Sequence, residues 1–211
     1  MLGCVIKALY LILKPVTTWE RILKARRSPG FLLVIYLMPL LLLASAAEAY
    51  GLMVWGRHQT GLHRVHKWLA GEAVVYEAAR IFITLSVITL FAVLIKMFGD
   101  TFRERNTYRQ AFTLAIYGLS PLFLLRLVEV LPITSWVAWA AGIALSLEVI
   151  YRGVPSVLEP DPPNAIGLFF IIAIVIFSIT GLEQFMTFWY LAGHSPSLQT
   201  AVSNLGAKLP F

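Results

Sequence analysis

Long stretches without any charged residue constrain this sequence more than any other feature. Residues 31–47 and 166–180 contain no Asp, Glu, Lys or Arg. A helix needs about 20 predominantly apolar residues to cross a bilayer core that is about 30 Å thick, because unpaired backbone groups are too costly in hydrocarbon. The sequence therefore predicts a helical protein that crosses the membrane.

The composition and the placement of charge agree with this interpretation. Of the residues, 59% are apolar and only 13% are charged, whereas soluble domains carry about 25% charged residues. The net charge is +6, and six of the 17 lysines and arginines precede residue 28, beside the first apolar stretch. That position is typical of contacts with anionic lipid headgroups. We therefore expect lipids rather than nucleic acid as partners, and no cofactor.

The chain divides into three parts by its apolar periodicity and its prolines. Residues 1–29 form an amphipathic interfacial segment, residues 30–192 an all-α bundle, and residues 193–211 a short polar tail. The bundle contains about five spans. The loop 153–164 holds four prolines, so we expect it to be stiff and non-helical. The five expected spans lie near residues 30–55, 70–98, 109–131, 133–152 and 165–192.

The N-terminal segment contains the start of a helix that is too short and too charged to span. Pro15 interrupts the apolar pattern, and Thr17 stands three residues before Glu20, which is the spacing of a capping box. We expect this helix to lie on the membrane surface with its Trp ring among the headgroups. The residues expected to contact lipid headgroups are Lys14, Trp19, Arg21, Lys24, Arg26 and Arg27.

The order and spacing of several short motifs resemble the Yip1 domain family in its short bacterial form. The motifs are Pro15-Val16-Thr17-Thr18-Trp19-Glu20-Arg21-Ile22, Tyr117-Gly118-Leu119-Ser120-Pro121, Leu131-Pro132 and Tyr151-Arg152-Gly153-Val154. The resemblance implies a five-span membrane protein of the bacterial cytoplasmic membrane. Eukaryotic members act in early secretory traffic, bind Rab-type GTPases and form hetero-oligomers, and they carry a long cytosolic N-terminal region. Here about 29 residues precede the first span, so we expect the architecture of the family without its GTPase binding.

Charged residues inside the predicted spans form one layer. Glu48, Arg126 and Glu183 each lie 17 residues after the start of an outward-running span, which places them at a similar depth, about 25 Å from the inner edge. Glu129 lies one turn beyond Arg126, and Arg80 with Glu77 adds to the layer. Charges in a bilayer need partners. Either Arg126 pairs with one of these carboxylates and holds helices together, or the layer is an outward-facing polar pocket for a cation, a proton or a lipid headgroup.

Small residues and prolines mark expected helix contacts. Ala138, Gly142 and Ser146 recur at every fourth position of the fourth span, which allows another helix to approach closely. That helix belongs either to the same bundle or to a second copy. Gly118 and Pro121 mark a contact in the third span, and Glu148 with Arg152 forms an i, i+4 pair at the interface.

Three histidines in a polar loop are weak candidates for a metal site. His58, His63 and His66 lie within nine residues, with Glu72 nearby as a further oxygen ligand. Histidines in a hydrophilic loop are usually plain surface residues, so we expect no metal. The sequence also contains no HExxH, GxSxG or P-loop motif, and we therefore expect no enzymatic activity.

Two functions compete for the bundle. The first is a non-enzymatic protein that organises or assists other membrane components, in contact with lipids and with other membrane proteins or itself. The second is a transporter or channel for an ion or small solute that uses the polar layer. Transport requires polar groups at the midplane and an exit on the inner side, whereas the middles of the second and fifth spans are apolar. The first function is therefore favoured.

The distribution of basic residues predicts the topology. With the N-terminus inside, 11 lysines and arginines lie on the inner side and five on the outer side. Residues 1–28 and 103–109 should then be cytoplasmic, and residues 194–211 should lie outside. Cysteine accessibility in a background that lacks Cys4 measures this. Labelling of Ser197→Cys only from the cytoplasmic side would contradict this topology and indicate the opposite orientation.

Overall fold

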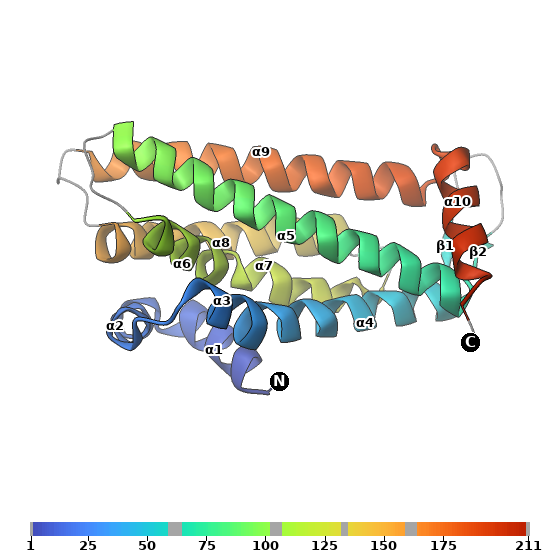
Figure 1. Cartoon of the computed structure of the whole chain (residues 1–211), viewed down its shortest axis with the longest axis horizontal. Coiled ribbons are helices and arrows are strands. Elements are labelled where there is room, and N and C mark those ends of the chain that lie inside the picture. Colours follow the sequence, from blue (N-terminus) through green and yellow to red (C-terminus); the bar gives the residue numbers. More distant parts are fainter. Residues whose placement is uncertain (1, 59–64, 102–106, 132–134, 159–163, 210–211) are drawn as a thin grey trace.

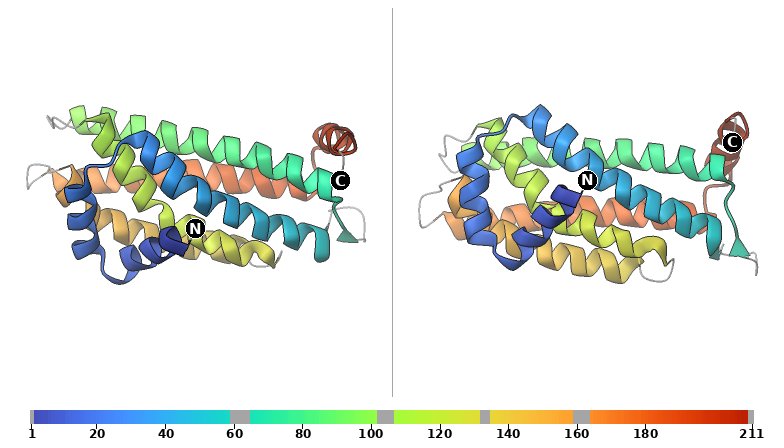
Figure 2. Two further views of the ribbon diagram at one scale, coloured as in Figure 1. Left: turned by 60° about the horizontal axis from the view of Figure 1, so that its bottom comes forward. Right: turned by 90° about the horizontal axis from the view of Figure 1, so that it is seen from below.

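Five long helices form an elongated bundle, as the sequence predicts. The computed structural model describes residues 2–58, 65–101, 107–131, 135–158 and 164–209. Figures 1 and 2 show the spans side by side, with α2 crossing one end of the bundle and α10 crossing the other. We call these the α2 end and the α10 end. Within these residues, five helices are long and apolar enough to span a membrane: Pro29–Val54, Ala70–Thr101 (α5), Tyr108–Val130, Ser135–Val157 (α8) and Ala165–Leu191 (α9).

The first span is a helix with a widened segment near its start. Ser28 accepts a hydrogen bond from the Phe31 backbone N–H at 3.3 Å and begins α3 (Pro29–Phe31). A π-helical stretch, Leu32–Leu37 (η1), follows and leads into α4, Met38–Val54. The second residue of α4 is a proline, which lacks the N–H that an α-helical turn requires. A widened turn before it is the expected adjustment.

The third span is broken in the middle. Thr107 and Gln110 form a capping box that begins α6, Tyr108–Gly118. A proline in the first turn of α7, Ser120–Leu125, prevents continuous α-helical hydrogen bonding, and the chain then tightens into the 3₁₀ segment Arg126–Val130 (η2).

Small residues of the fourth span contact other helices of the same bundle. A Cβ at Gly142 would lie 3.0 Å from the Cα of Leu122 in α7. Ala138 and Ser146, which share its helix face, are buried. Pro121 is also buried, and a Cβ at Gly118 would meet the side chain of Ile150. Packing within the bundle therefore accounts for the small-residue pattern.

Two features of the loops differ from expectation. The fourth span extends to Val157 and includes Pro155, whereas the sequence predicted a non-helical loop from residue 153. A proline in a last helical turn disturbs only the turn before it, so the helix tolerates it there. The expected polar tail contains a helix, α10, Pro196–Gly206. The backbones of α10 and α5 touch at Gly206 and Gly71, where neither residue has room for a Cβ.

The N-terminal segment forms two helices that pack on the bundle and cover the Trp19 side chain. It forms α1, Leu2–Leu13, and α2, Pro15–Ala25. The prediction for Trp19 is wrong: the ring is 0% exposed, and its indole N–H donates to the Val149 carbonyl at 3.1 Å. Its ring also meets Tyr117 edge-on at 6.1 Å. The core therefore accommodates the large apolar ring and also supplies the acceptor that its N–H needs when buried.

The predicted Thr17–Glu20 capping box is also absent. The helix α2 already begins at Pro15, whose fixed φ suits a first helical position. Thr17 is therefore inside the helix, and its hydroxyl donates to the Lys14 carbonyl. Glu20 is exposed.

The first and third spans touch backbone to backbone near the α10 end. A Cβ at Gly51 would overlap the Val130 carbonyl and lie 3.0 Å from the Val130 Cα. Both segments are held by other contacts, because Gly51 lies one turn from buried Glu48 and Val130 ends the segment that holds Arg126. The glycine therefore sets how closely the first and third spans approach.

We predict that Gly51→Ala lowers the free energy of unfolding by about 1–3 kcal/mol, the usual cost of overpacking. Gly167→Ala is the matched control, since a Cβ there meets nothing within 4 Å. It should leave stability unchanged or raise it by up to about 1 kcal/mol through better helix propensity. Unfolding in mixed detergent micelles measures both. Equal stability of the two variants would contradict the close approach.

Candidate functional site

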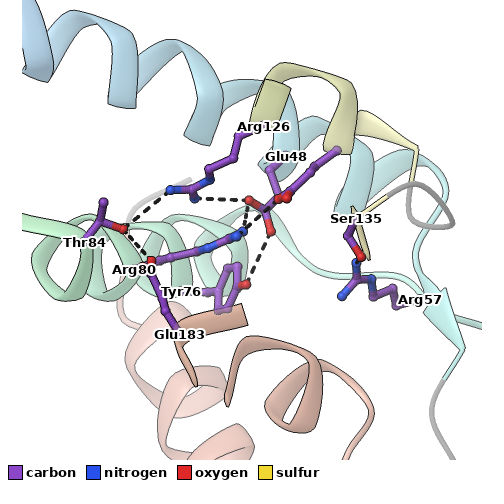
Figure 3. A network of polar contacts seen from close by, with 9 residues as sticks. Glu48, Arg57, Tyr76, Arg80, Thr84, Arg126, Ser135 and Glu183 are labelled. Carbon is purple, nitrogen blue, oxygen red and sulfur yellow. Dashed lines mark hydrogen bonds and ion pairs between the residues drawn. The ribbon is translucent and has the colours of Figure 1, made fainter. Parts of the chain in front are cut away.

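A cluster of buried charged side chains joins the first three spans (Figure 3). Glu48 comes from α4, Arg80 from α5, and Arg126 and Glu129 from η2. Each of these four residues exposes 6% of its surface or less. Such burial is costly for a single charge, and these charges are tolerated because they lie together.

Arg80 is the central cation of the cluster. Its Nη1 forms an ion pair with Glu48 Oε2, and its Nη2 forms one with Glu129 Oε2 at 3.2 Å. Glu48 is correspondingly the shared anion, because Arg126 Nη2 approaches the same oxygen at 3.4 Å. The Tyr76 hydroxyl donates to Glu48 Oε1 at 3.4 Å. One arginine and one glutamate thereby connect three spans.

Helical spacing explains why α5 supplies most of the partners. Tyr76, Arg80 and Thr84 recur at every fourth residue, so they lie on one face of α5. Thr84 extends the network to the fifth span, since its hydroxyl donates to Glu183 Oε1 at 2.8 Å. The same hydroxyl oxygen accepts from Arg126 Nη1 at 3.5 Å. The hydroxyl of Thr84 therefore connects Glu183 to the cluster.

The cluster contains more carboxylates than guanidinium groups. Four carboxylates lie in or beside the cluster, namely those of Glu48, Glu77, Glu129 and Glu183. The guanidinium groups of Arg80 and Arg126 form ion pairs with Glu48 and Glu129. Glu77 takes part in none of these ion pairs, and the Ser45 side chain is its hydrogen-bonding neighbour. The site therefore has an acidic side chain that the ion pairs do not use.

Little open space lies beside the cluster. A cavity of about 20 Å³ is bordered by Arg80, Arg126, Glu129 and Glu183. This is close to the space that one water molecule needs, about 10–15 Å³ at the least. At the edge of the cluster, Arg57 Nη2 donates to the Ser135 hydroxyl at 3.0 Å, as Figure 3 shows. The arrangement suits permanent ion pairing between helices, with room for a bound water.

The structure brings the predicted intramembrane residues together but with different pairing. The predicted pair of Arg126 with Glu48 is present. Glu129, expected as another partner of Arg126, pairs with Arg80 instead. Glu183 reaches Arg126 only through Thr84. Sequence reasoning did not identify the central role of Arg80 or the parts played by Tyr76 and Thr84, although their spacing by four residues was a visible signal.

The histidine loop gives limited support for a metal site. His63 lies outside the described residues, and His66 Nε2 lies 3.9 Å from Glu72 Oε2. The described ranges contain no group of three or more metal-ligating side chains. His58 and His66 belong to a short antiparallel pair of strands, Arg57–His58 (β1) and Val65–His66 (β2). The expected surface pair Glu148–Arg152 is present at 2.8 Å.

The basic residues in and next to α2 remain candidates for lipid contact. Lys14, Arg21, Lys24 and Arg26 are exposed, and Arg27 is half-buried. Trp19 is removed from this set by its position in the core.

Comparison with protein families gives one match, to the model described as Yip1 domain, over residues 9–182. This covers well over half of the chain. Neither a curated protein nor a solved structure matches the chain.

We predict that Arg80→Ala and Glu48→Ala are strongly coupled. Each alone should destabilise the protein by about 3–5 kcal/mol, because it leaves a buried charge short of a partner. The double variant should be more stable than the sum of the two losses by about 0.5–3 kcal/mol. Unfolding in mixed micelles provides the four free energies of the cycle.

The exposed pair Glu148–Arg152 is the matched control for this cycle. Its coupling should be about 0.3–0.5 kcal/mol. Additive losses at Arg80 and Glu48 would contradict the ion pair.

Proposed function

The chain belongs to the Yip1 domain family, and we propose that it is a non-enzymatic membrane protein that organises or assists other membrane components. It does so by presenting a rigid helix bundle to lipids and to neighbouring membrane proteins or further copies of itself. One observation carries this proposal: the buried charges of the bundle are engaged with one another across helices, beside a cavity of about 20 Å³. Such a site supports rigidity rather than passage of a solute.

The placement in the membrane is part of the proposal. We place the protein in the bacterial cytoplasmic membrane with its N-terminus inside and its C-terminus outside. The positive-inside rule supports this orientation, since exposed Lys14, Arg21 and Lys24 lie at the α2 end. There they are positioned to contact anionic headgroups of the inner leaflet.

Transport of an ion or small solute is the second candidate function. The observation that favours it is Glu77, a buried carboxylate that takes part in none of the ion pairs between the described residues. Against it, the face of α9 beyond Thr180 toward the α2 end is formed by apolar residues, including buried Ile172 and Ile176. A continuous polar route from the cluster to the α2 end would need polar side chains at those positions.

Photocrosslinking tests the organising role. A benzophenone analogue of phenylalanine replaces Phe82 in α5, or Phe170 or Phe177 in α9, which all have exposed side chains. We predict a discrete protein adduct from some of these positions in cells. Buried Phe91 is the control and should give none. Lipid adducts alone from every exposed position would contradict a protein partner.

Flux measurements distinguish the second candidate. In proteoliposomes, proton, Na⁺ and K⁺ gradients should decay no faster than in empty vesicles. A faster decay that Glu77→Gln abolishes would instead establish transport and overturn the organising role.

A further inference from the structure

A basic cavity lies at the α2 end, far along the bundle from the ion cluster. Its volume is about 450 Å³, and Arg26, Arg27 and Arg109 line it together. The first two arginines follow α2 and the third stands in the first turn of α6, so the fold brings together residues 82 or more positions apart. No carboxylate is among the described residues that line the cavity.

The three arginines have no ion-pair partner among the described residues. Within the described part of the chain, none of them has a carboxylate oxygen within 4 Å. The N-terminal end of α6 adds partial positive charge to the same place, because Thr107 and Gln110 of its first turn also line the cavity. The electrostatic field in the cavity therefore favours an anion.

Specific contacts hold two of the arginines at the cavity. Arg109 Nε donates to the Arg27 carbonyl at 3.1 Å, and the Arg27 guanidinium lies 4.8 Å above the Phe31 ring. Arg26 ends α2 with φ +40°, in the left-handed region that arginine rarely adopts. That turn places consecutive arginines on the wall of one cavity.

The cavity spans the boundary between the polar and apolar zones of the bundle. It is lined by Leu32 near the start of the first span, Arg109 at the start of the third and Val157 at the end of the fourth. Ile22 and Leu23 of α2 add further apolar surface. An ordinary anion site has no need of such a wall, whereas a phospholipid presents a phosphate directly above glycerol and acyl chains.

We propose that this cavity binds the phosphate group of an anionic ligand, and that an anionic phospholipid of the adjacent leaflet supplies it. Guanidinium groups match phosphate oxygens in charge and in paired hydrogen-bond geometry. The described residues that line the cavity offer no carboxylate to the cationic headgroup of phosphatidylcholine. This inference rests on the proposed function, since it names the lipid class that the membrane-organising bundle holds at its α2 end.

Native mass spectrometry of the full chain in detergent tests the site, with dioleoyl phosphatidylglycerol as the probe and dioleoyl phosphatidylcholine for comparison. Arg26→Gln combined with Arg109→Gln should weaken phosphatidylglycerol binding roughly tenfold or more, as expected for two lost charge-assisted hydrogen bonds. Lys67→Gln combined with Lys208→Gln is the matched control. It removes the same charge from exposed residues at the α10 end that do not line the cavity, and it should retain affinity within about twofold.

Equal weakening in both double variants, or equal binding of the two lipids, would overturn the site. Competition with inorganic phosphate distinguishes a lipid from a soluble molecule as the source of the bound phosphate group. Failure of millimolar phosphate to displace the lipid supports a lipid source, whereas displacement that depends on Arg26 and Arg109 supports the phosphate site with a soluble source.

A single variant replaces the double variant if the latter does not fold. Arg109→Gln removes the hydrogen bond from Arg109 to the Arg27 carbonyl, whereas Arg26→Gln leaves it in place, so Arg26→Gln alone is then used. Binding of phosphatidylglycerol without any protein adduct in the crosslinking experiment would contradict the partner in the proposed function and leave the lipid site intact. Protein adducts without selective binding of phosphatidylglycerol would contradict the lipid site and leave the proposed protein partner intact.

Discussion

The contact between Arg80 and Glu48 is the interaction on which the arrangement of the bundle depends. Hydrocarbon offers no water to a buried ion, so each must find its partner within the protein. Arg80 reaches Glu48 on the first span and Glu129 on the third, and Glu48 also receives Arg126. The relative positions of three spans are thereby fixed by two side chains. Close backbone contact between Gly51 and Val130 follows from the same approach of the first and third spans.

Different interactions stabilise the two ends of the bundle. Toward the α10 end, ion pairs connect the spans. Toward the α2 end, the contacts are aromatic, with Trp19 and Tyr36 both packed on Tyr117. The arginines of the α2 end remain outside this core and line a cavity at the membrane boundary. Charge is thus neutralised inside the protein at one end and is available to a ligand at the other.

The architecture follows from the sequence because span length and charge placement obey local rules. Apolar stretches define five helices, and equal depth along the spans brings Glu48 and Arg126 together. Which side chains pair within the layer depends on the rotation of each helix about its axis. The third span tightens into a 3₁₀ segment at Arg126, and this changes the direction of the side chains that follow. Glu129 therefore pairs with Arg80 and not with Arg126. The position of Trp19 depends on a distant partner, the carbonyl of Val149, and an amphipathic pattern cannot reveal it.

Hydrogen exchange followed by mass spectrometry tests most directly whether Arg80 holds three spans together. In lipid nanodiscs, Arg80→Ala should accelerate amide exchange in α5 and also in the segments around Glu48 and Arg126, which lie on other helices. The segments of the α2 end around Trp19 and Tyr117 should exchange as in the unchanged protein. Faster exchange confined to α5, or no change in any segment, would contradict the account.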